Sequence, residues 1–380
     1  MIRASVRDGL MRSLIPSSTT LLSTAETLAI AAVGGIGFVM LHIPAGLVSG
    51  SVLAVAIASL AGRPMHVPQP LSRVCFVMIG ILLGAVVTPE TLHGVATWPA
   101  SVAILAAATL AMIVATTSYL RFVHGWDWVS AFLGASPGAM GQVVVLSAEF
   151  KADIRGVAIV QVMRVLLVTI GLPGGLALFG LAAGSVIAVP GPPGGSSAGE
   201  LLLLVAVSAA SAMVLTRLRF PGGLLFGAMA GSAVLHGTGW VHAVLPWWLA
   251  SATVLVVGAV AGSRFANTSV RMLLDYLGAA LGSLAVALGV AVIFASIVMI
   301  FLPFRPADVT IAFAPGSQDQ MMLLALALKL DPVYVGAHHL TRWLVCTMSI
   351  ALFTRAVTAD DARPHEKRRW RRPGQGAFDD

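Results

Sequence analysis

Runs of apolar residues long enough to cross a lipid bilayer recur from about Thr20 to Arg355, and each is closed by a proline, glycine or charged cluster. Lipid offers the backbone no hydrogen bonds, so a chain can span it only as helices or as a closed barrel. The runs are rich in Leu and Ala and lack the alternation of barrel strands. Only 10% of the residues are charged, whereas an ordinary soluble domain is about a quarter charged. The sequence therefore predicts an all-α polytopic integral membrane protein.

The chain also matches itself when it is shifted by about 177 residues. Pro44–Gly50 (PAGLVSG) falls on Pro221–Gly227 (PGGLLFG). With one more residue of shift, further glycines, prolines and polar residues coincide, and shared hydrophobicity alone does not produce such matches. These pairs are Gly80 with Gly258, Gly84 with Gly262, Pro137 with Pro315, Gly138 with Gly316, Gln142 with Gln320, Lys151 with Lys329, Asp153 with Asp331 and Arg164 with Arg342. The sequence thus predicts two homologous halves.

Each half is expected to contain about five transmembrane helices and one interrupted segment. The helices are expected near residues 20–42, 46–61, 71–88, 98–121 and 154–179, and then near 198–216, 222–238, 246–263, 275–303 and 332–355. The interrupted segments, 128–150 and 307–330, carry Pro-Gly near their middle, and proline removes a helical donor. Each is either two half-helices that meet at a loop inside the membrane or one kinked span.

The predicted domain organisation follows from these elements. Membrane repeat 1 covers 20–180 and membrane repeat 2 covers 198–355, joined by a Gly/Pro/Ser linker over 181–197. A basic cytoplasmic N-terminus (1–19) and a basic cytoplasmic tail (356–380) flank them. A basic cluster beside a last membrane helix is typical of an anchor at anionic lipid, so the lipid bilayer is the predicted partner and direct nucleic-acid binding is not predicted.

The distribution of basic residues favours half-helices that return to the side from which they entered. Each half then crosses the membrane five times, an odd number, so that the second repeat is inverted relative to the first. Arg305 and Lys329 then lie outside, and the other basic residues considered lie on the cytoplasmic face with both termini. If both segments crossed instead, Lys151, Arg155 and further arginines would move outside. The positive-inside rule therefore favours two inverted repeats.

The two copies around the Pro-Gly breaks, at 136–168 and 314–346, resemble the signature of the bacterial AbrB-duplication membrane protein family, and the resemblance covers about 20–355. It implies a multi-pass protein of the bacterial cytoplasmic (inner) membrane. Members are labelled as ammonia monooxygenases or as AbrB family regulators of gene expression. The family shares its name with a small soluble DNA-binding regulator, whose fold this chain cannot adopt. Where the family has Gly and an acidic residue after Pro-Gly, the first copy here has Ala139 and Gln142, and the second has Ser317 with Asp319.

Two arginines are expected near the middle of the membrane. Arg164 lies ten residues beyond Ile154, roughly 15 Å along a helix and so near the middle of a core about 30 Å thick; Arg342 has the matching depth. A charge there costs roughly 2.5–3.5 kcal/mol on insertion scales. Each is either a structural group, in an ion pair or as a cap on freed carbonyls, or part of an anion or coupling site. Glu26, Glu200 and Asp319 are the candidate counter-charges.

The polar residues after the breaks would lie at half-helix N-termini, which bind solutes and ions in many secondary transporters. The alternative is a packing kink whose polar residues are satisfied internally. A histidine pair one turn before Arg342 suggests proton or metal handling, but adjacent helical residues point about 100° apart. The predicted substrate-binding set is Pro137, Gly138, Ala139, Gln142, Arg164, Pro315, Gly316, Ser317, Asp319, Gln320, His339 and Arg342.

The leading hypothesis is a secondary transporter or exporter of a small polar or anionic solute, coupled to H⁺ or Na⁺, with its site between the two broken helices. The alternative is a membrane-embedded sensor that affects gene expression through a partner of the basic tail. An oxidoreductase of the monooxygenase type would need a convergent metal-ligand set, and the sequence shows none, so neither an enzyme nor a cofactor is predicted. The sequence does not determine the oligomeric state, and a homo-oligomer is one of the states it allows.

Overall fold

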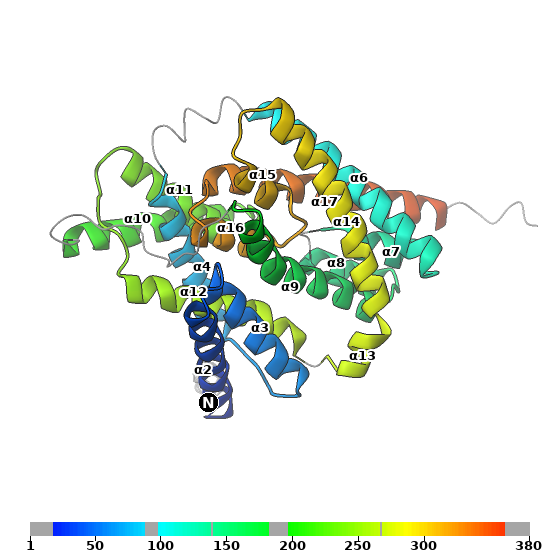
Figure 1. Ribbon diagram of the computed structural model, residues 1–380, viewed down its shortest axis with the longest axis horizontal. Coiled ribbons are helices and arrows are strands. Elements are labelled where there is room, and N and C mark those ends of the chain that lie inside the picture. Colours follow the sequence, from blue (N-terminus) through cyan, green and yellow to red (C-terminus); the bar gives the residue numbers. More distant parts are fainter. Residues whose placement is uncertain (1–17, 88–97, 138–139, 182–196, 267, 362–380) are drawn as a thin grey trace, which may run out of the picture.

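A computed structural model describes residues 18–87, 98–137, 140–181, 197–266 and 268–361, and these residues form helices and no strands (Figure 1). Within these described ranges, six helices are long and apolar enough to cross a membrane: α2, α6, α9, α10, α12 (extended here by the short η2) and α14. Three shorter helices, α3, α4 and α11, are also apolar. The described chain is thus the all-helical, polytopic type of protein that the apolar runs predict.

The order of elements in the first half is repeated in the second. In the first half the helices are α2 (Ser18–Met40), α3 (Gly46–Leu60), α4 (Gln69–Gly84), α6 (Pro99–Val123), α7 (Trp128–Ala135), α8 (Met140–Glu149) and α9 (Ile154–Leu178). In the second they are α10 (Ala198–Arg217), α11 (Gly223–Gly237), α12 (Trp247–Gly262), η2 (Ser263–Phe265), α13 (Val270–Asp275), α14 (Leu277–Phe301), α15 (Pro306–Phe313), α16 (Gln318–Ala327) and α17 (Pro332–Asp361). Only η2 and α13 lack a counterpart among the described elements.

Most helices begin and end within a few residues of the predicted bounds. The exceptions are α4, which ends at Gly84 rather than near 88, and α17, which runs past 355 to Asp361. Most of the predicted linker, the N-terminus before residue 18 and the tail after 361 lie outside the described residues. The matched turns before α3 and α11 share one backbone conformation, because their N-caps, Ala45 and Gly222, have φ of 51° and 62°.

The two halves interlock through matched glycines. Gly80 and Gly84 of α4 lie against the backbone of α11, at Leu225 and Met229 respectively. Reciprocally, Gly258 and Gly262 of α12 lie against α3, at residues 48–51 and 52–56. Small residues let helix backbones approach this closely. Residue numbers rise together along both contacts, so α4 runs parallel to α11 and α12 runs parallel to α3.

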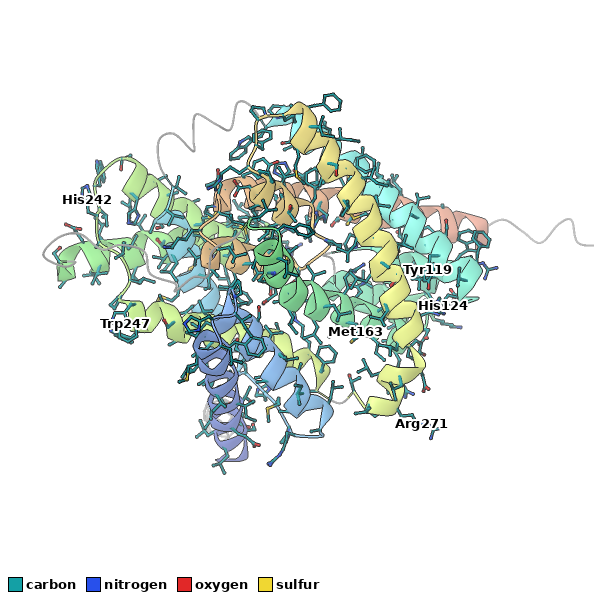
Figure 2. The ribbon with its side chains drawn as sticks, viewed as in Figure 1. Tyr119, His124, Met163, His242, Trp247 and Arg271 are labelled. Atoms are coloured by element: carbon teal, nitrogen blue, oxygen red, sulfur yellow. The ribbon has the colours of Figure 1, made fainter. Side chains whose placement is uncertain are left out.

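The fourth helices of the two halves, α6 and α14, pack side by side and run antiparallel (Figure 1). Tyr119 and His124, at the end of α6, lie against Gly282 and Gly278 in the first turns of α14 (Figure 2). At this end of the pair, the Tyr276 hydroxyl donates to Asp153 at the start of α9 (2.7 Å). That hydrogen bond, with burial, raises the pKa of Tyr276 to about 12, so the phenol stays a donor.

An aromatic cluster lies at the opposite end of the α6/α14 pair. Trp98, which precedes α6, packs edge-on against Tyr334 in the first turn of α17, with ring centroids 5.6 Å apart. Phe304, just after α14, also lies against Tyr334, at 5.0 Å. Because α9 begins at one end of the pair and α17 begins at the other, these two matched helices also run in opposite directions.

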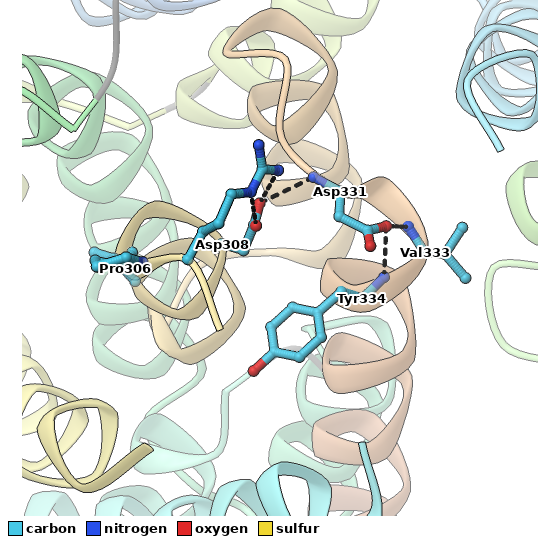
Figure 3. Close-up of polar contacts among 7 residues, drawn as sticks. Pro306, Asp308, Asp331, Val333 and Tyr334 are labelled. Carbon is cyan, nitrogen blue, oxygen red and sulfur yellow. Dashed lines mark hydrogen bonds and ion pairs between the residues drawn. The ribbon is translucent and has the colours of Figure 1, made fainter. Parts of the chain in front are cut away.

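Both interrupted segments fold into hairpins of two half-helices rather than into kinked spans. In the first, the Asp153 amide after α8 donates to the Ser130 hydroxyl at the start of α7 (2.8 Å). In the second, the Asp331 amide after α16 donates to the Asp308 carboxylate at the start of α15 (2.9 Å), as Figure 3 shows. Each chain segment thus leaves its hairpin beside the point where it entered. The hairpin ends are 23 residues apart in both halves.

Candidate functional site

Arg164 caps the broken end of the first hairpin. It lies in the middle of α9 and is 4% exposed. Its guanidinium donates to the carbonyls of Ala135 (3.3 Å) and Ser136 (3.4 Å), at the end of half-helix α7. One turn earlier on α9, the Gln161 amide donates to the carbonyl of Leu133 (3.0 Å). These carbonyls have no partner within their own half-helix because Pro137 ends it.

Arg342 repeats this arrangement more tightly in the second hairpin. Its guanidinium donates to the carbonyls of Ala312 (2.8 Å) and Ala314, at the end of half-helix α15. His339, in the position that matches Gln161, donates from Nε2 to Ile311 (3.1 Å). Since the Ile311 carbonyl can only accept, the other ring nitrogen is free to accept from Arg342 (3.3 Å). Of the two structural alternatives for these arginines, the cap is the one that the geometry shows.

None of the proposed counter-charges pairs with either buried arginine. Asp319 forms an ion pair with Arg264, which follows α12 (3.1 Å). Glu26 pairs with Arg63 (3.0 Å). Glu200 accepts from the backbone amide of His242 (3.2 Å). The structure thus shows no ion pair between Arg342 and the candidate counter-charge Asp319, because the first turn of α16 directs this carboxylate toward Arg264 at the end of α12.

The first turn of α16 contains polar groups that have no hydrogen-bond partner in the described part of the chain. Its N-cap, Ser317, makes no side-chain cap, and its buried hydroxyl has no hydrogen bond within the described residues. The Gln320 side chain is 0% exposed, and both its Oε1 and its Nε2 lack a partner there. Leaving such a group unsatisfied costs about 1–3 kcal/mol. A polar solute or water at this position would recover that free energy.

A cavity of about 380 Å³ adjoins the same turn. Its charged walls are Arg264 and Asp319, whose side chains are 26% and 18% exposed. With side chains this little exposed, either charge would be costly to leave without a partner. The remaining lining comes from α4, α10, α11, α16 and α17, namely Phe76, Thr216, Pro221, Gly222, Gly223, Leu224, Leu225, Gln318 and Trp343.

The structure brings part of the predicted set together. Pro137, Pro315 and Gly316 are buried at the two breaks. Gly138 and Ala139 lie outside the described residues, as does the side chain of Gln142. The guanidinium groups of Arg164 and Arg342 reach the C-terminal ends of α7 and α15, and His339 bonds to the same end of α15. Ser317, Asp319 and Gln320 lie at the N-terminal end of α16.

His338 has contacts different from those of His339, as expected for adjacent residues of a helix. Its Nδ1 lies 2.7 Å from the Tyr334 carbonyl and its Nε2 lies 3.0 Å from the Ser101 hydroxyl of α6. In the described residues, no three His, Cys, Asp or Glu side chains are grouped so that they could hold a metal ion. The two histidines therefore contribute to packing between elements rather than to a shared ligand set.

Four residues were missed in the sequence. Arg264 was counted only as a cytoplasmic charge, and no local motif connects it with Asp319. Gln161 could have been found, because the shift that matches Arg164 with Arg342 also matches Gln161 with His339. The same shift aligns Ser130 with Asp308. The pair of Gln161 with His339 and the pair of Ser130 with Asp308 were both missed. In each pair the two residues differ in type, although they form equivalent hydrogen bonds.

Comparisons with known proteins agree on one family. The model of the AbrB family, described as transition state regulatory protein AbrB, matches residues 47–358. The chain is 25% identical over 317 residues to "Putative regulator AbrB" of Escherichia coli (strain K12), covering 80% of this chain and 87% of that protein. It is 26% identical over 252 residues to "Uncharacterized protein YhjN" of Bacillus subtilis (strain 168), covering 61% of this chain and 64% of the relative. With a family match over most of its length, the chain belongs to the AbrB family.

Proposed function

We propose that this protein is a secondary transporter or exporter of a small polar or anionic solute, built from two inverted repeats, with its site at the broken helices near the middle of the membrane. The observation that carries the proposal is the first turn of α16, where polar atoms of Ser317 and Gln320 have no hydrogen-bond partner among the described residues. A packed structural kink would satisfy these groups internally. A transporter leaves them for a solute that comes and goes.

The directions of matched helices support the inverted arrangement. A helix that packs antiparallel against its own counterpart, as α6 does against α14, is related to it by an axis perpendicular to both helices. For membrane-spanning helices such an axis lies in the membrane plane, as in transporters with inverted repeats. The hairpin closures support the same arrangement, because each hairpin returns to its own side.

The charges near the two ends of the α6/α14 pair support an orientation. Arg121, Lys151, Arg155 and Arg271 belong to one end, and Arg305 and Lys329 belong to the other. The positive-inside rule then places the first end in the cytoplasm. In a bacterial inner membrane, ten crossings would leave both termini cytoplasmic, and the second hairpin would enter from the outside.

The electrostatics of the hairpins support a solute with negative charge. In the described structure, neither Arg164 nor Arg342 has a carboxylate partner, and each is 4% exposed or less. The N-terminus of α16 adds the positive end of a helix dipole. Coupling to H⁺ or Na⁺ would compensate for the energy of moving a polar solute against its gradient.

Uptake into proteoliposomes tests this function. Purified protein should exchange or accumulate a radiolabelled small solute from a panel of organic acids and zwitterions, and Gln320→Leu should reduce uptake without loss of inserted protein. Ser349→Ala, on the same half but away from the site, serves as the matched control. Failure of the wild-type protein to move any member of the panel under either an H⁺ or a Na⁺ gradient would contradict the proposal.

Reporter fusions test the orientation separately. A reporter fused at Lys151 should be cytoplasmic and one fused at Lys329 should be periplasmic, because matched loops of inverted repeats lie on opposite faces. Finding both reporters on one face would rule out inversion.

A membrane-embedded regulator is the second candidate, favoured by the printed name of the Escherichia coli relative. Its signal would pass through a partner bound by the basic tail after Asp361. Removal of the tail should leave uptake intact in a transporter, and it should abolish any effect on gene expression in a regulator. A monooxygenase would need a set of metal ligands, and the described residues group no three candidates.

A further inference from the structure

We propose that the cavity beside Arg264 and Asp319 binds an amino-acid-like zwitterion with a short apolar side chain. This inference rests on the transport function proposed above and specifies its solute. The cavity has a volume of about 380 Å³, and it adjoins the turn of α16 in which Ser317 and Gln320 have polar atoms without a partner among the described residues.

The charges of the cavity match a solute that carries both signs on neighbouring atoms. The Arg264 guanidinium and the Asp319 carboxylate lie 3.1 Å apart. A simple anion that binds Arg264 would leave Asp319 without its partner, and a simple cation that binds Asp319 would leave Arg264 without one. A carboxylate and an ammonium on one carbon can pair with both groups at once. Both new pairs are charge-assisted hydrogen bonds, which are the strong kind.

The rest of the cavity sets the character of the side chain. Phe76, Leu224, Leu225 and Trp343 form an apolar wall, to which a short aliphatic group is complementary. The backbone on the opposite wall comes close because Gly222 has no side chain. A Cβ atom at this position would lie 2.5 Å from Nε2 of Gln318, another lining residue.

The matched place in the first half lacks these charges. Val86 stands where Arg264 stands, Gly141 where Asp319 stands and Val165 where Trp343 stands. It therefore offers no guanidinium or carboxylate for a zwitterion. One molecule of this chain therefore binds one solute, in its second half.

A matched trio of probes tests the site. L-leucine carries both charges, 3-methylbutylamine carries only the ammonium, and 4-methylpentanoate carries only the carboxylate, while the apolar group stays similar. We expect L-leucine to raise the melting temperature of the full-length protein in detergent in proportion to its concentration, and the other two to have little effect. Arg264→Gln and Asp319→Asn should each weaken the apparent affinity by roughly tenfold to a hundredfold. Arg63→Gln, which removes one partner of the remote ion pair with Glu26, should leave it unchanged.

The outcomes are distinguishable. Stabilisation by 4-methylpentanoate equal to that by L-leucine would overturn the inference in favour of a simple anion site, and stabilisation by none of the three would overturn it outright. Equal binding by wild type and both cavity variants would place the solute elsewhere and also overturn it. Stabilisation by L-leucine without uptake into proteoliposomes would support this site and contradict the transport function. Uptake of another solute without stabilisation by L-leucine would do the reverse.

Discussion

The two hairpins share a frame and differ in their chemistry. Each hairpin is closed by a hydrogen bond from the backbone amide of a matched aspartate, Asp153 or Asp331. Each is also capped by an arginine of the following helix, Arg164 or Arg342. The turn of the second hairpin, however, adds Asp319, which forms an ion pair with Arg264 at the wall of the cavity.

This difference shows how a duplicated membrane protein can specialise. The arginine caps and the amide hydrogen bonds that close the hairpins satisfy backbone groups that any broken helix frees. They are therefore needed in both halves. In the site that we propose, the groups that recognise a solute are needed only once. Substitutions at the N-terminus of a half-helix can therefore accumulate in one copy without harm to the fold of either.

The largest difference between the halves is expected at the arginines. Arg342→Gln should destabilise the protein by about 3 kcal/mol, because the carbonyls at the end of α15 lose short, charged donors. Arg164→Gln should cost about 1–2 kcal/mol, since its hydrogen bonds are longer. Thermal unfolding in detergent measures both, with the exposed Arg271→Gln as a control. A cost at Arg164 equal to or above that at Arg342 would show that the two caps are not ranked by their geometry.

An intermediate effect is expected at the hydrogen bonds that close the two hairpins. Asp308→Ala should cost about 2 kcal/mol, because it leaves the Asp331 amide and the Arg305 guanidinium without their partner (Figure 3). Ser130→Ala should cost about 1 kcal/mol, since it removes one neutral acceptor. Asp308→Asn keeps an acceptor and should fall between wild type and Asp308→Ala in thermal unfolding. Equal losses at Asp308→Ala and Ser130→Ala would mean that the ion pair with Arg305 adds nothing.

The matched turns before α3 and α11 are expected to respond in opposite directions. Ala45 adopts a left-handed backbone, so Ala45→Gly should stabilise the protein by less than about 1 kcal/mol. Gly222→Ala should destabilise it by about 1–2 kcal/mol for two reasons. The added Cβ would collide with the Gln318 side chain, and a residue other than glycine is strained at this positive φ. Melting temperatures of the two exchanges should therefore shift in opposite directions. A stabilised Gly222→Ala would show that Gln318 moves away freely and that this wall of the cavity is not rigid.

Much of the fold was predictable from the sequence because its signals are long or repeated. Apolar runs marked the long helices, and the repeat from Pro137 and Pro315 to Arg164 and Arg342 aligned the hairpins. Both arginines are buried within the protein, whereas their depth in a membrane stays a prediction. The site was predicted only in part, since the first turn of α16 was identified but the partner of Asp319 was not.

By itself, the sequence determined the apolar helices, the duplication and the positions of the breaks, because the bilayer demands long apolar runs and proline interrupts a helix wherever it occurs. Tertiary structure alone decided what the charged side chains contact. Arg342 lies 28 residues from the carbonyl of Ala314, and Arg264 lies 55 residues from Asp319. Contacts over such separations depend on how helices pack, and a carboxylate in a first helical turn pairs with whichever cation that packing brings within reach.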